Sequence, residues 1–103
     1  MFKLIILLAK KHGMGDEEFA GYFLNVHAPL ARKMVGVRRY VVNIVQKPPN
    51  REPEFHGVAE LWFDDRESMK KAFSSAEGGV TQKDTEKFAS KAVSLFIEEH
   101  EMS

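Results

Sequence analysis

The chain of 103 residues is 44% apolar and 29% charged, a balance that predicts one globular domain over residues 1–103 with one hydrophobic core. Fifteen basic residues offset fifteen acidic ones, so no net field recruits nucleic acid or an anionic membrane surface. Cysteine is absent, which excludes disulfides, thiolate metal sites and a cysteine nucleophile, and it fits the cytoplasmic location that we expect.

The first predicted element, residues 2–10, is apolar at nearly every position. It is too short to span a bilayer, and basic residues follow where a signal peptide would carry small ones. We therefore interpret it as a strand, with Leu4 and Leu8 on one face and Ile5 and Leu7 on the other. Helices in so short a chain cover only one of these faces. The second face predicts a homodimer, and whether dimers assemble further is left open.

A helix is predicted from Asp16, the expected N-cap, with acidic residues in its first turn. Pro29 predicts a kink or a break between residues 25 and 30, and Gly36 ends the segment. His27 lies on the flank of the helix, roughly 80° from Phe19 at ~100° per residue. The apolar stripe consists of Phe19, Phe23, Val26 and Leu30.

Two β-branched segments, residues 37–45 and 56–63, are predicted strands joined by a proline-rich loop. Asp64 with Glu67 forms an expected capping box that opens a second helix. The stripe of this helix consists of Met69, Ala72, Phe73 and Ala76.

The end of the chain is predicted to hold one more strand, over residues 92–99. Gly78 and Gly79 are expected to end the second helix, and a short helix over residues 84–90 would be anchored by Phe88. The resulting order, βαββαβ, is that of an α+β, ferredoxin-like fold. It has a four-stranded antiparallel sheet with helices on one face and the first strand in the centre.

The central strands are expected to pair with Val41 opposite Trp62 and Tyr40 opposite Phe63. Tyr40 then faces the helices, whereas Trp62 faces away from them among valines. A solvated face would hardly carry this tryptophan, which again favours a second sheet packed against the first.

His27 and Tyr40 are the candidate catalytic residues, since both would lean into the gap between helix and sheet. An imidazole is suited to proton transfer near neutral pH, and a tyrosine can donate a hydrogen bond to a carbonyl or enolate oxygen. The alternatives are a core or capping histidine near Pro29, and a strand aromatic that packs on Phe63. His56, at the start of its strand, would overhang the pocket or stay solvated. No two histidines have metal-ligand spacing, and neither a P-loop nor a dinucleotide fingerprint is present, so no metal and no cofactor are expected.

Three motifs in order carry a resemblance to a known family: His27-Ala-Pro-Leu-Ala, Gly36-Val-Arg-Arg-Tyr-Val-Val-Asn43 and Gly57-Val-Ala-Glu-Leu-Trp-Phe-Asp-Asp65. An Asp-x-x-x-Phe pair, residues 84–88, and a Phe-x-x-Glu-His ending, residues 96–100, extend it. With these features the chain resembles the EthD family, named for ether degradation. The resemblance implies a dimeric α+β barrel, in which two ferredoxin-like sheets pack face to face.

Relatives in this barrel group include cofactor-free monooxygenases, polyketide cyclases and muconolactone isomerases. In the methylmuconolactone isomerase type, a helix histidine and the tyrosine of a Gly-x-x-x-Tyr stretch line a pocket between helices and sheet. His27 and Tyr40 match these two positions, whereas Leu61 stands where those relatives have a cysteine.

The resemblance and the residues together predict cofactor-independent handling of a small hydrophobic or aromatic carbonyl compound. His27 would move a proton and Tyr40 would polarise the carbonyl oxygen. The substrate-binding wall would consist of Tyr22, Phe23, Leu61, Phe63, Phe88 and His56. A non-catalytic binding or accessory subunit of a redox or degradation pathway, and a structural dimer with a filled core, are the alternatives.

Overall fold

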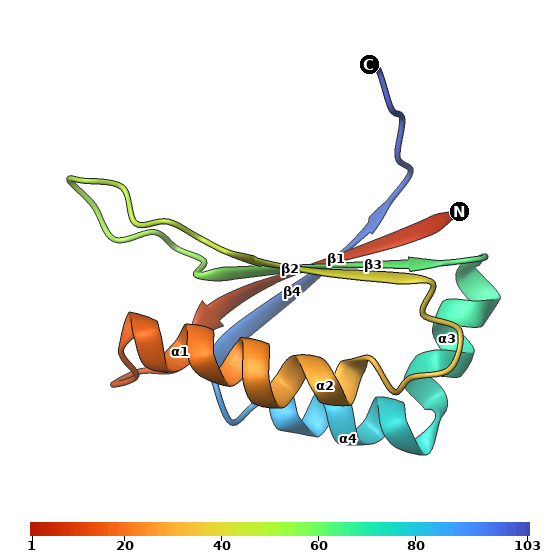
Figure 1. Cartoon of the computed structure of the whole chain (residues 1–103), viewed down its shortest axis with the longest axis horizontal. Coiled ribbons are helices and arrows are strands. Elements are labelled where there is room, and N and C mark those ends of the chain that lie inside the picture. The colour runs from red at the N-terminus through yellow and green to blue at the C-terminus, as the bar shows by residue number, and fades with distance from the viewer.

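The computed structural model describes residues 1–103 and contains one four-stranded antiparallel sheet with all helices on one face (Figure 1). The strand order is β2-β3-β1-β4, so the first strand is central, as predicted. This strand, which is apolar on both faces, therefore has a hydrogen-bonded neighbour at each edge, β3 and β4. The final strand begins three residues earlier than predicted, and the second strand is shorter. The strands are β1 (Phe2–Lys10), β2 (Arg39–Ile44), β3 (Gly57–Phe63) and β4 (Ala89–Ile97).

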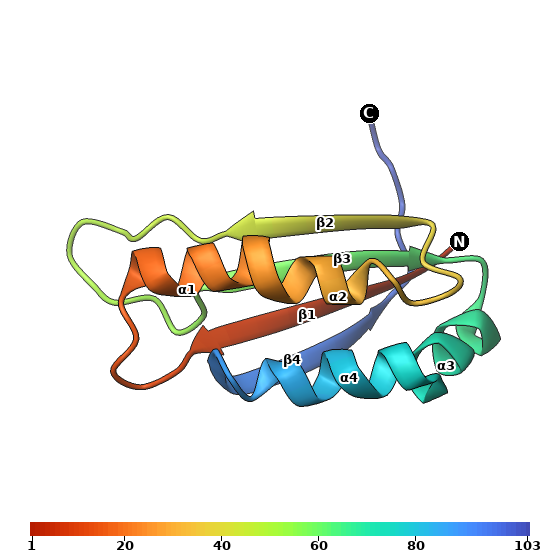
Figure 2. The same ribbon diagram turned by 60° about the horizontal axis from the view of Figure 1, so that its bottom comes forward.

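The helices form two groups below the sheet. α1 (Asp16–Tyr22), a π-helical turn (Phe23–His27) and α2 (Ala28–Ala31) follow one another without a break along β2 and β3 (Figure 2). α3 (Arg66–Ser74) turns a corner into α4 (Ala76–Thr85), which runs along β4 (Figure 2). None of these helices has the length and apolar character needed to cross a membrane.

The π-helical turn changes which residues of the first helical segment are buried. The Ala28 N–H donates to the carbonyl of Phe23, five residues back, so one extra residue is accommodated in this turn. In a regular helix the buried line would pass from Phe23 to Val26. The extra residue adds ~100° of rotation, so His27 takes the buried position instead. Val26 is 44% exposed and His27 only 6%. The predicted stripe through Val26, and the flanking position of His27, were wrong for this reason. The irregularity predicted around Pro29 takes the form of the π turn.

Both predicted N-caps were wrong by one residue. Gly15 caps α1 and Asp16 is its first residue; Asp65 caps α3 and accepts a hydrogen bond from the Ser68 N–H at 2.7 Å. Ser75 ends α3 and caps α4 by accepting from the Gly78 N–H.

The two glycines expected to end a helix lie instead inside α4, which also replaces the short helix predicted over residues 84–90. Gly78 packs against the end of α3, where an added Cβ would lie 2.3 Å from the Ala72 carbonyl oxygen. The helix corner is therefore closed by the absence of a side chain at Gly78.

The β2–β3 pairing differs from the prediction by two residues, with Tyr40 opposite Leu61 and Val41 opposite Glu60. An even shift leaves every side chain on its predicted face, because side chains alternate with a period of two. Tyr40 thus faces the helices and packs on the core. The buried apolar core consists of Leu4, Leu8, Phe19, Phe23, Ala31, Met34, Ala59, Leu61, Phe63, Met69, Ala72 and Phe88.

The face opposite the helices combines aliphatic side chains with a charged cluster. Lys3 bonds Glu60 at 2.8 Å and Glu99 at 3.0 Å, and its Nζ lies 4.6 Å from the centroid of Trp62. Trp62 Nε1–H donates to Glu99, and Arg39 covers the same ring. Trp62 is only 7% exposed as a result. This face carries the aliphatic residues Ile5, Leu7, Val41, Val58, Val93 and Leu95.

Candidate functional site

The π turn directs His27 into the space between the helices and the sheet, where a buried carboxylate meets it. His27 Nδ1 lies 2.9 Å from Asp84 Oδ2, and the Tyr22 hydroxyl donates to Asp84 Oδ1 at 2.7 Å. His27 and Asp84 are 6% and 5% exposed. The three side chains come from α1, the π turn and α4, so the contact joins the two helical groups.

The environment defines the protonation state of this histidine. Burial lowers the pKa of His27, while the hydrogen bond and the charge of Asp84 act in the opposite direction. The imidazole is therefore neutral near pH 7. Because the Asp84 carboxylate only accepts hydrogen bonds, Nδ1 carries the proton and Nε2 has a free lone pair. The ring of Phe88, 4.7 Å away between centroids, holds the imidazole in place.

Two neighbouring cavities share His27. The inner one has a volume of about 30 Å³, and Tyr40 and Leu61 line it from the sheet side. The outer one, of about 400 Å³, lies between β4 and the α3–α4 pair. Residues common to both linings are Ile6, His27, Phe73, Thr81 and Thr85.

Two polar atoms remain available to a ligand in this space. His27 Nε2 and the Tyr40 hydroxyl make no hydrogen bond within the chain, yet the protein has no buried side-chain nitrogen or oxygen without a partner. Both atoms therefore keep some accessible surface, and both residues line the inner cavity. Burial raises the pKa of Tyr40 to about 12, so this hydroxyl remains a donor at neutral pH.

The residues predicted from sequence divide into three groups. His27, Tyr40 and Leu61 line the inner cavity together. Phe23, Phe63 and Phe88 are completely buried in the core and line neither cavity. Tyr22 holds Asp84. A part in ligand binding for Tyr22, Phe23, Phe63 and Phe88 stays a prediction. His56 lies in a different pocket.

Sequence reasoning missed Asp84, Thr81 and Thr85. The signal for Asp84 was its place four residues before the core aromatic Phe88 in the quoted Asp-x-x-x-Phe pair. α4 contains two glycines and no regular apolar stripe, so its buried side could not be deduced from periodicity.

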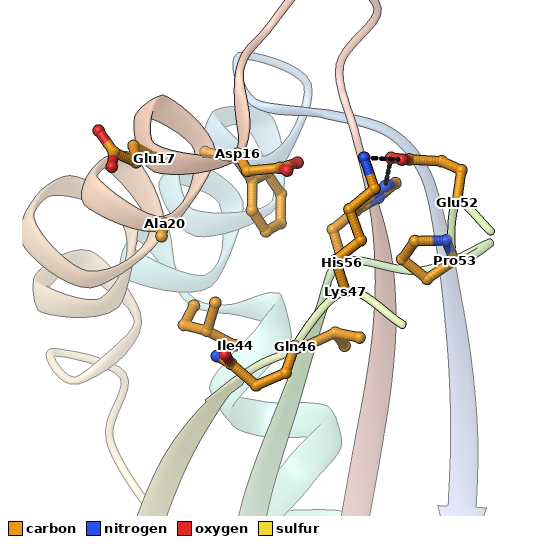
Figure 3. Close-up of a pocket in the computed structure, with 11 residues that line it drawn as sticks. Asp16, Glu17, Ala20, Ile44, Gln46, Lys47, Glu52, Pro53 and His56 are labelled. Carbon is orange, nitrogen blue, oxygen red and sulfur yellow. Dashed lines mark hydrogen bonds and ion pairs between the residues drawn. The ribbon is translucent and has the colours of Figure 1, made fainter. Parts of the chain in front are cut away.

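His56 lines a pocket of about 290 Å³ between the start of α1 and the loop that joins β2 to β3 (Figure 3). Its Nδ1 accepts the Lys10 backbone N–H at 3.0 Å, and its Nε2–H donates to Glu52 at 3.1 Å. Both ring nitrogens are therefore engaged.

Ligand atoms of Asp16, Glu52 and His56 lie within 4.8 Å of one another, a spacing that a cation could use. Their charges are already compensated: Lys10 pairs with Asp16 and Lys47 bonds Glu52 at 2.9 Å. The hydrogen bond from Lys47, which has the largest effect, and the one from His56 lower the pKa of Glu52 to about 2. Figure 3 shows the contacts of Lys47 and His56 with Glu52. Lys10 also pairs with both Asp16 and Glu52, so we interpret the group as an ion-pair network that holds the long loop against α1.

Fold and cavity together define an α+β, ferredoxin-like protein with a histidine–carboxylate pair between helices and sheet. The family model described as EthD domain matches residues 11–92. The chain therefore belongs to the EthD family, as the motifs indicated. An EthD family protein from Bacillus halodurans is 35% identical, with a TM-score of 0.83 over 97% of this chain and 99% of that chain.

More distant similarities extend the comparison. An uncharacterized 11.0 kDa protein in the thcB-thcC intergenic region of Rhodococcus erythropolis is 23% identical over 96 residues, 93% of each chain. A dimeric ferredoxin-like protein of unknown function from Bacteroides fragilis is 15% identical, with a TM-score of 0.72 over 94% of each chain. SnoaB, a cofactor-independent oxygenase from Streptomyces nogalater, is 10% identical, with a TM-score of 0.71 over 98% of this chain and 94% of that chain. At these identities the structural likeness shows the fold alone.

Proposed function

We propose that the protein binds a small hydrophobic carbonyl compound and transfers a proton at the carbon next to its carbonyl, without a cofactor. The observation that carries this proposal is the convergence of His27 and Tyr40 on one small cavity, with Asp84 behind the histidine. The cavity thus offers one base and one hydrogen-bond donor and is otherwise largely apolar.

In the proposed step, His27 Nε2 removes a proton from the carbon next to the carbonyl. The electron pair of the broken C–H bond forms a carbon–carbon double bond, and the carbonyl π electrons move to the oxygen. Tyr40 donates its hydrogen bond to this enolate oxygen. Asp84 accepts the hydrogen bond from Nδ1–H and stabilises the imidazolium that forms. Return of the proton to the same carbon gives exchange, and to another atom gives isomerisation.

We further propose a homodimer through the face opposite the helices. Leu95 is 40% exposed there, beside several half-buried aliphatic residues. The dimeric neighbour from Bacteroides fragilis has the same fold and supports this assembly. A cytoplasmic location also stays a prediction.

The direct test is deuterium exchange in D₂O, followed by ¹H NMR on uncharged ketones and lactones. The wild type should exchange the protons next to the carbonyl faster than buffer, and His27→Gln and Tyr40→Phe should each lose most of this rate. His12→Gln is the matched control, because His12 is exposed and lines neither cavity. Specific binding without exchange would replace the enzyme with a non-catalytic binding protein. If no compound binds, both assignments fail.

A further inference from the structure

The outer cavity opens at the edge of the sheet, between β4 and α4. Its rim is formed by the exposed residues Gln82, Ala92, Ser94 and Phe96. Ala92 is paired with Leu8 and Phe96 with Leu4, and both leucines belong to the core, so this side of β4 faces the helices. A partner on the opposite face would leave the opening free.

Neither cavity is lined by aspartate, glutamate, lysine or arginine, and the guanidinium of Arg66, beside the rim, lies over the Phe96 ring, 4.9 Å from its centroid. The hydroxyls of Thr81 and Thr85 donate to the helix carbonyls of Glu77 and Thr81, at 2.8 and 3.3 Å, and have no proton left for a ligand. His27 is neutral for the reason given above. An ionised group inside the cavities would therefore lose its hydration without gaining a counter-ion, which is strongly unfavourable.

The two cavities differ in size, so each can hold a different part of one ligand. About 30 Å³ exceeds the roughly 10–15 Å³ that a single water needs but is far too small for a whole ligand, so the inner cavity can take one oxygen. About 400 Å³ is within the usual range for a small-molecule site. Its walls are mainly apolar, with Met69 and Phe73 from α3 and Ile6 from β1.

We propose that the outer cavity is the specificity site: uncharged carbonyl compounds enter between α4 and β4, and their carboxylate analogues are rejected. The apolar body occupies the outer cavity, and the carbonyl oxygen reaches the Tyr40 hydroxyl in the inner one. This inference rests on the proposed function for the placement of the carbonyl group. Ser94 and Ala92 control access without touching the reacting atoms.

The test compares 4-phenylbutan-2-one with 3-phenylpropanoate, in which a carboxylate oxygen replaces the methyl group of the ketone, so that the two have the same shape but differ in charge. Binding is measured by calorimetry and by amide chemical shifts of the full chain. We expect the ketone to bind at least tenfold more tightly. Ala92→Trp should weaken ketone binding at least tenfold by filling the opening. Val80→Trp, on the exposed outer side of α4, is the matched control and should leave binding unchanged.

A gain of binding provides a second arm. Ser94→Lys places a cation at the rim and should raise the affinity for 3-phenylpropanoate at least tenfold. Equal affinities for the two compounds in the wild type, or full ketone binding in a folded Ala92→Trp, would overturn the inference. Selective, blockable ketone binding without deuterium exchange would support the specificity site and refute the proposed proton transfer. The two conclusions can therefore fail separately.

Discussion

Tyr22 and Tyr40 offer a matched pair for testing the site, because burial raises both pKa values to about 12, and only at Tyr22 does a hydrogen bond to Asp84 add to the effect. Tyr22 donates to the Asp84 carboxylate at 2.7 Å. Tyr40 has no partner within the chain, and its pKa is raised by burial alone. Tyr22→Phe should therefore destabilise the fold, whereas Tyr40→Phe should affect binding and exchange.

The expected magnitude follows from the lost contact. A hydrogen bond to a charged group contributes about 1.5–3 kcal/mol, so Tyr22→Phe should cost about 2 kcal/mol in the free energy of unfolding. With ~2.1 cal/mol/K per residue, this lowers Tm by roughly 9 °C for 103 residues. Tyr40→Phe should stay within about 0.5 kcal/mol of wild type, since its hydroxyl faces a cavity. Urea titrations followed by Trp62 fluorescence measure both values.

The pH dependence provides an internal check on this pair. Unfolded tyrosine titrates near pH ~10, so the unfolded state releases its proton first. The contribution of each tyrosine to stability is fully present below that pH and is lost as the pH rises toward about 12, by less than roughly 3 kcal/mol per ring, because both rings retain some solvent contact. Each phenylalanine variant should remove its own share of this alkaline loss. A Tyr40→Phe variant that is destabilised but still catalyses deuterium exchange at the wild-type rate would refute the assignment of roles.

Three further predictions concern acid, the helix corner and the dimer. Because the pKa of folded His27 lies below its usual value, the unfolded state takes up the proton first, and stability should fall as the pH drops below ~6.5; His27→Gln should flatten this part of a stability profile measured in urea. Gly78→Ala should cost more than about 2 kcal/mol because its Cβ meets backbone, whereas Gly79→Ala, with open space, should gain up to ~1 kcal/mol; thermal unfolding compares them. Leu95→Glu should yield monomers in light scattering, and a mass identical to wild type would contradict the proposed interface.

The sequence was sufficient for the topology because its strongest signals are periodic. The apolar run of β1 on both parities indicated a central strand, and the β2–β3 faces survived a register error of two residues. The capping errors were of one residue, since neighbouring acids at Asp64 and Asp65 are equally good caps by composition. Such errors move a helix boundary without changing the fold.

The site was less predictable because it depends on an exception to periodicity. A π turn has no clear sequence signal other than Pro29, yet it moves His27 from the flank of the helix to its buried side. Asp84 lies 57 residues away, so only the tertiary structure brings the two together. Gly78 presented a helix stop in the sequence, but its lack of a side chain instead allows α4 to approach α3 closely.

The way in which His27 is held bears on the choice between a site and a structural core. A histidine kept only for packing would have both ring nitrogens satisfied within the fold, as His56 does. Here Nδ1 is fixed by a buried carboxylate that Tyr22 also holds, while Nε2 faces a cavity. Burying three polar groups in an apolar core is costly unless each is paired, and the fold pairs all but the atoms that a ligand could reach. This arrangement favours a ligand site over a filled structural core.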